Sequence, residues 1–138
     1  MLHGTDYRHT QVLTASPHRL HLMVVDGAIR HAVQAEQALA AGDFETAHAA
    51  LGRSRDFVSE LLAGLDGRQA PELVERLKGL FLFVYRNLVD ADRRREPERV
   101  RDALKILEMH RETWLEAGRL PSSAAAGDVI QTGRSWMT

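Results

Sequence analysis

The sequence predicts an all-α protein that folds as an antiparallel up-and-down four-helix bundle. Three of the four prolines stand where a helix can begin, because proline fits the first helical position. Apolar residues then recur at spacings of three and four, and no stretch alternates with the period of two that a strand shows. Glycines follow these stretches as stop signals, and the short connections favour antiparallel neighbours.

The first helix is expected over residues 17–41. Ser16 is a typical N-cap, and the missing N–H of Pro17 costs nothing in the first turn. One face of this helix is formed by Leu20, Val24, Ala28 and Ala35. Beside that face lie Met23, Ile29 and Val33. The helix therefore has more apolar surface than one bundle face needs, and such a surplus usually indicates a partner.

The other helices are expected over 43–65, 71–94 and 97–117, with Asp43 as the cap of the first of them. The inward positions expected in these helices are Phe44, Ala47, Leu51, Val58, Leu61 and Leu65, then Leu73, Leu77, Leu80, Val84, Leu88 and Ala91, then Val100, Leu104, Leu107 and Trp114. Ser54 interrupts the first of these sets. Residues 80–85 are apolar all round, which again exceeds what one face needs.

Length and composition indicate one globular domain over 16–118, preceded by a mostly polar segment, 1–15, and followed by a flexible tail, 119–138. The formal net charge of -1 argues against a nucleic-acid binder, which needs a positive excess. The absence of cysteine excludes disulfides, thiolate zinc sites and cysteine nucleophiles. No apolar run is long enough to span a membrane, and the first ten residues contain no signal-peptide core, so we expect a cytoplasmic protein without membrane insertion.

The histidines and acids do not form a convincing metal site. His18 and His21 share a helix face, but two imidazoles make a poor site, and we expect both side chains to be solvated. Glu45 and His48 match half of a di-iron bundle motif, which needs two such pairs, and both lie off the expected inward face. We therefore expect no metal and no cofactor, although a metal- or cofactor-binding bundle enzyme stays open as an alternative.

The sequence contains no catalytic motif. It has neither the Gly-x-Ser-x-Gly turn of a serine hydrolase nor a glycine loop that cradles phosphate. The basic run 93–95 is balanced by neighbouring acids and is expected to be a solvated helix end. We expect a binding protein rather than an enzyme.

Asp26 stands in the most apolar part of the first helix, 22–29, where a carboxylate needs a partner or water. Arg30, four residues on, is a local candidate, and Arg111 on the fourth helix is another. Alternatively, Asp26 anchors the backbone of another segment. Gly27 costs up to about 1 kcal/mol in a helix interior, which makes sense if another backbone approaches closely.

Four stretches of the chain together form a recognisable pattern. The first is Tyr7-x-x-x-Gln11-Val12-x-Thr14-Ala15-Ser16-Pro17-x-x-Leu20-x-x-Met23-x-x-Asp26-Gly27-Ala28-Ile29. The others are Ala41-Gly42-Asp43, Glu60-Leu61-x-x-x-Leu65-Asp66 and Leu107-x-x-x-Arg111-x-x-Trp114. Their order and spacing resemble the FliS family of flagellin export chaperones. Two features depart from the family pattern: Val25 replaces a frequent aromatic residue, and the loop near Asp66-Gly67 is short.

The resemblance implies a cytosolic chaperone that binds the disordered C-terminal segment of flagellin, prevents premature polymerisation and assists its export, with the export gate as a further partner. It also implies that the segment before the first helix caps an apolar groove and yields it to flagellin. We expect the partner and cap surface to comprise Tyr7, Gln11, Val12, Leu13, Leu20, Met23, Asp26 and Ile29. A structural dimerisation module is an alternative, and a homodimer is left open. Trp114 is expected to pack in the core or at the helix end.

Overall fold

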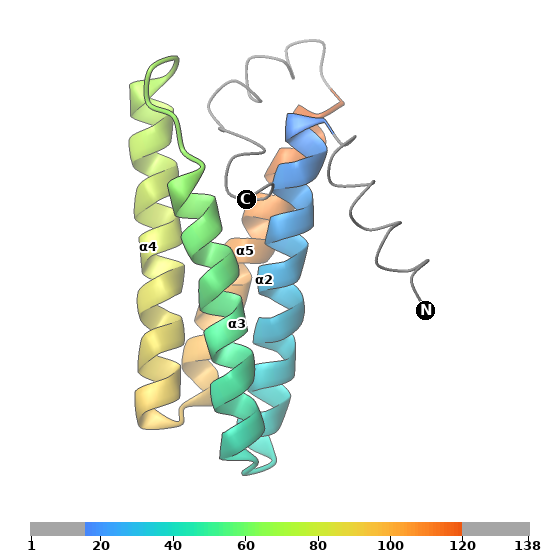
Figure 1. The fold of residues 1–138 in the computed structure, drawn as a ribbon, viewed down its shortest axis with the longest axis vertical. Coiled ribbons are helices and arrows are strands. Elements are labelled where there is room, and N and C mark those ends of the chain that lie inside the picture. The colour runs from blue at the N-terminus through green and yellow to red at the C-terminus, as the bar shows by residue number, and fades with distance from the viewer. Residues whose placement is uncertain (1–15, 120–138) are drawn as a thin grey trace, which may run out of the picture.

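Four long helices pack side by side in the computed structural model, which describes residues 16–119 (Figure 1). They are α2 (Pro17–Ala40), α3 (Phe44–Ala63), α4 (Pro71–Arg94) and α5 (Pro97–Ala117). Successive helices run in opposite directions, and α2 and α4 each pack against both α3 and α5. The described part of the chain contains no strand, so the predicted four-helix bundle is confirmed. The predicted capping segment 1–15 and tail residues 120–138 lie outside the described residues.

The helix boundaries fall within two residues of the predicted ones, because the local capping signals are strong. The Ser16 hydroxyl accepts a hydrogen bond from the Arg19 amide at 3.2 Å. Asp43 accepts one from the Thr46 amide at 3.2 Å, and hydrogen bonding from the Thr46 side chain, together with this amide, lowers the pKa of its carboxyl. α4 and α5 begin at proline without a side-chain cap. Gly42, with φ at 77°, makes the turn between α2 and α3.

The predicted inward positions supply most of the core. Buried among them are Leu20, Val24, Ala28, Ala35, Ala47, Leu51, Val58, Leu61, Leu77, Val84, Leu88, Ala91, Val100, Leu104, Leu107 and Trp114. The prediction was wrong for α4 at two positions, because Val74 and Phe81 are buried where Leu73 and Leu80 were expected. The buried residues of α4 keep spacings of three and four, and an α-helix turns 100° per residue, so a position one residue earlier falls on the flank.

Phe44 was also expected inside but is 38% exposed, in the first turn of α3. The guanidinium carbon of Arg95 lies 4.1 Å from the centroid of its ring, which is a cation–π contact. Arg95 ends α4 with a left-handed backbone, φ 57°, where glycine is the usual residue. This contact therefore ties the end of α4 to the start of α3.

Ser54, which interrupts the apolar pattern of α3, is completely buried. Its hydroxyl donates a hydrogen bond of 2.8 Å to the carbonyl oxygen of Ala28 on α2. A buried hydroxyl needs such a partner, and a backbone carbonyl of the neighbouring helix supplies it. The interruption thus marks a contact between α2 and α3.

Gly27 faces the same neighbouring helix. A Cβ atom at this position would lie 2.7 Å from two ring atoms of Phe57 on α3. The expectation of a closely approaching backbone is therefore wrong, because an aromatic side chain occupies the space that the missing Cβ leaves. Gly79, on α4, has nothing within 4 Å of its own ideal Cβ position.

Gly27→Ala and Gly79→Ala are expected to change stability in opposite directions. Alanine favours a helix interior over glycine by up to about 1 kcal/mol, so Gly79→Ala should stabilise the protein by about that amount. At Gly27 the same gain is opposed by overlap with Phe57, since overpacking typically costs 1–3 kcal/mol, and we expect a net loss of about 1 kcal/mol. Urea unfolding of both variants tests this, and equal stabilisation by the two would contradict the contact.

Candidate partner-binding site

The outer side of α2 carries a stripe of four residues with spacings of four, three and four: Leu22, Asp26, Ile29 and Val33, called the α2 stripe below. Its three apolar members are partly buried and pack against the core. They remain accessible at their outer edges, so a partner could extend the core here without moving any helix.

An ion pair crosses the α2 stripe at its middle. Arg111 Nε on α5 donates a hydrogen bond of 2.6 Å to Asp26 Oδ1, and both side chains are just under half exposed. This confirms Arg111 as the partner of Asp26, rather than Arg30, the candidate on its own helix. A pair this exposed contributes little to stability, about 0–1 kcal/mol. Its charges nevertheless remain available to polar groups of a partner.

The structure separates the predicted site residues into three groups. Met23, Asp26 and Ile29 follow one another at spacings of three across the accessible side of α2, and all three are partly buried. Leu20 lies in the core with 7% of its surface exposed. The remaining four, Tyr7, Gln11, Val12 and Leu13, lie outside the described residues.

A cluster of aromatic rings joins the start of α2 to the end of α5. His21 and His110 are both buried, and their Nε2 atoms lie 2.7 Å apart. His18 donates through Nε2 to the Trp114 carbonyl oxygen at 2.6 Å, and Trp114 Nε1 donates back to the His18 carbonyl oxygen at 3.2 Å. The rings of His18 and Trp114 are stacked, with centroids 5.4 Å apart. The expectation of solvated histidines is therefore wrong, while Trp114 packs as expected.

Helix periodicity could have revealed this cluster. His21 stands three residues before Val24, and His110 stands three residues after Leu107 and four before Trp114. Both histidines therefore occupy core positions of their helices. The sequence could not show that the two rings meet, because that depends on how α2 and α5 pack.

Burial keeps this histidine pair neutral. The pKa of His21 falls from 6.5 to about 3, chiefly because the ring is buried, and the charges that His110 and His18 carry when protonated add to this shift. Burial alone lowers the pKa of His110 to about 4. The hydrogen bond between them requires one ring with a proton on Nε2 and one without. At neutral pH the pair meets that requirement.

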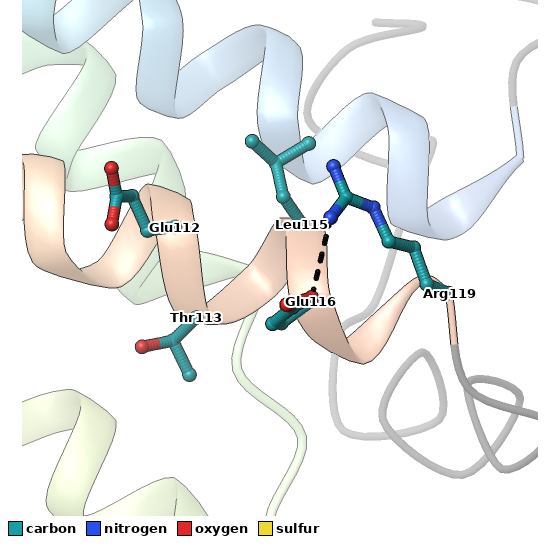
Figure 2. Close-up of a pocket in the computed structure, with 5 residues that line it drawn as sticks. All are labelled: Glu112, Thr113, Leu115, Glu116 and Arg119. Carbon is teal, nitrogen blue, oxygen red and sulfur yellow. Dashed lines mark hydrogen bonds and ion pairs between the residues drawn. The ribbon is translucent and has the colours of Figure 1, made fainter.

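An open hollow follows the last turns of α5, at the same end of the bundle as this cluster. Figure 2 shows the five residues that line it: Glu112, Thr113, Leu115, Glu116 and Arg119. Leu115 points toward α2, and Arg119 pairs with Glu116 at 3.4 Å. These side chains offer charged and apolar contacts, but they do not form a nucleophile with a positioned base.

A polar cluster lies at the opposite end of the bundle. Asp92 on α4 accepts hydrogen bonds from His48 Nδ1 at 2.8 Å and from Arg55 at 3.1 Å. Glu45 and His48 are exposed, as expected for residues off the inward face. Within residues 16–119, no three histidine, aspartate or glutamate side chains are placed to hold a metal ion. The cluster therefore joins α3 to α4.

Further apolar side chains are exposed on α4 and α5. Phe83 is 45% exposed and Met109 is 51% exposed, and Leu73 is also accessible. Phe83, with Ile29 and Val33 of the α2 stripe, belongs to the apolar surplus that the sequence indicated. No helix within 16–119 is both long enough and apolar enough to cross a bilayer.

Comparison with known proteins identifies the family. The model of a family described as flagellar protein FliS matches residues 3–121. A Salmonella typhimurium protein named flagellar secretion chaperone FliS is 31% identical over 104 residues, which cover 75% of this chain and 77% of that protein. A Vibrio cholerae protein of the same name is 24% identical over 105 residues, covering 76% and 77%. The family match spans most of the chain and confirms the resemblance, so the chain belongs to the FliS family.

Proposed function

We propose that this protein is a cytoplasmic flagellar secretion chaperone that binds the C-terminal segment of flagellin. In this role it covers the segment, prevents premature polymerisation and assists export, with the export gate as a further partner. The family, and the name that the Salmonella typhimurium and Vibrio cholerae relatives share, support the chaperone role. The protein acts by binding, without catalysis.

The α2 stripe is the observation that carries this proposal. A segment that is disordered alone can fold into a helix and place apolar side chains at i, i+3 and i+4 on such a surface. Leu22, Ile29 and Val33 are already held in place by the core, so only the client has to be ordered. Ordering a client costs at least about 2–5 kcal/mol, which burial of apolar surface has to offset.

The Asp26–Arg111 pair gives this surface polarity and direction. Its two charges stand at the centre of an apolar stripe, where they can bond to polar groups of a client helix. Met23 widens the surface, and a flexible thioether adapts to different partners. In this proposal Tyr7, Gln11, Val12 and Leu13 cover the surface before the client arrives.

Ile29→Lys is expected to weaken binding of a flagellin C-terminal peptide at least tenfold. The substitution places a charge in the apolar stripe, where a bound client would have to desolvate it. Gln37→Lys is the matched control, because it adds the same charge to an exposed position of the same helix. Calorimetry with the full chain gives both affinities, and circular dichroism checks that both variants keep their helices.

Two results would contradict the proposal. If the unsubstituted chain binds no flagellin peptide, the client is wrong. If it binds, and both lysine variants retain the same affinity, the client is right but the α2 stripe is not its surface. The full chain should also capture flagellin from cell extract, and it should do so through the same C-terminal segment.

A further inference from the structure

We infer that His21 and His110 form an acid-labile latch that holds the start of α2 against the end of α5. The two rings come from helices far apart in the sequence, and their Nε2 atoms are joined by a single hydrogen bond of 2.7 Å. Their ring planes are nearly perpendicular at 81°, with centroids 4.9 Å apart. This bond is a direct polar link between the two helices inside the core.

The proton count explains why acid weakens the latch. In the neutral pair, Nε2–H of one ring donates to the lone pair on Nε2 of the other. An additional proton places a positive charge in the core. On Nδ1 of the donor ring it leaves the bond in place, whereas on the accepting Nε2 it leaves two N–H groups facing each other at hydrogen-bond distance, so the bond is lost.

Among the described residues, the pair is surrounded by aromatic rings and by groups of like charge. On α2 the neighbouring titratable group is His18, whose positive charge opposes protonation of His21. On α5 the adjacent charge is Arg111, which is engaged by Asp26. α4 contributes the ring of Phe81, 5.0 Å from that of His110. Within residues 16–119, no carboxylate of α2, α3, α4 or α5 forms a hydrogen bond to either imidazole.

The pH window follows from the two states. In the unfolded chain both histidines titrate near 6.5, whereas the folded pKa values are about 3 and about 4. The unfolded state therefore binds protons first as the pH falls, and folding stability declines below pH 6.5 until the folded pair also titrates. Between pH 7 and pH 5 each histidine raises the unfolding equilibrium constant by about 25-fold.

The decisive variant replaces both histidines, His21→Leu with His110→Leu. Leucine fills a similar space in the core and does not titrate. Urea unfolding at pH 7 and pH 5 gives the acid-induced change in the unfolding constant for each protein. His48→Gln is the matched control, since it removes an exposed histidine from α3. His31, whose pKa is also lowered by burial, is unchanged in all three proteins.

The latch predicts that the acid-induced change is at least tenfold smaller in the double variant than in the unsubstituted protein and in His48→Gln. A difference of less than tenfold between the double variant and the other two proteins would overturn the latch. If the double variant does not fold, titration of the ring protons by NMR in the unsubstituted protein decides the matter. Two rings that stay neutral down to pH 5 support the latch, and midpoints near 6.5 for both would overturn it.

Discussion

Phe81→Ala is expected to lower the free energy of unfolding by about 3–5 kcal/mol, which is typical for removing a buried aromatic ring. Phe81 is completely buried on α4, and its ring lies 5.0 Å from that of His110 and 6.3 Å from that of His21. Alanine would leave a cavity between α4 and the histidine pair that rigid helices cannot close. Urea unfolding monitored by circular dichroism measures the loss.

Phe83→Ala is the matched control for this prediction. It removes the same ring from the same helix only two residues away, but Phe83 is 45% exposed. Its truncation should change stability by no more than about 0.5 kcal/mol. Comparable losses in the two variants would mean that α4 presents a different face to the core.

Trp114→Ala is expected to cost a similar amount, about 3–5 kcal/mol, and to lower the melting temperature by roughly 10 °C or more. The indole is 4% exposed, stacks on His18 and donates a hydrogen bond to its carbonyl oxygen. It also lies 4.3 Å from His21, measured between ring centroids. The substitution therefore removes both the packing and the polar contact between the ends of α2 and α5.

Two further variants separate these contributions. Trp114→Phe keeps an aromatic ring but loses the indole N–H. Its melting temperature should fall between those of the unsubstituted protein and Trp114→Ala. Met109→Ala, at a residue that is 51% exposed on the same helix, should leave the melting temperature nearly unchanged. A Trp114→Ala protein that melts like Met109→Ala would disprove the role of the indole at this junction.

The helices could be predicted because their signals are local. Caps such as Ser16 and Asp43, and turn residues such as Gly42, act within a few positions along the chain. The sequence was a weaker guide to which face each helix buries, as α4 shows. Its sequence is apolar on several sides between 80 and 85, so periodicity alone could not decide between Leu80 and Phe81.

The candidate site could be predicted only where one helix supplies it. The apolar surplus beside the main face of α2 was visible in the sequence, and the pair of Asp26 with Arg111 was one of several candidates. The burial of His21 was missed because histidine occurs both in cores and on surfaces, so the residue type alone does not place it. Only the approach of His110 from a segment 89 residues away gives its nitrogen a partner.

The contact between His18 and Trp114 also shows that the described chain enters and leaves the bundle at neighbouring points. The two ends of the described chain, 16 and 119, therefore lie close together. A circularly permuted chain, joined by a short linker between 16 and 119 and cut at the Gly42 turn, would retain every helix and every helix–helix interface. New termini would then stand at the far end of the molecule, beside the contact of Arg95 with Phe44.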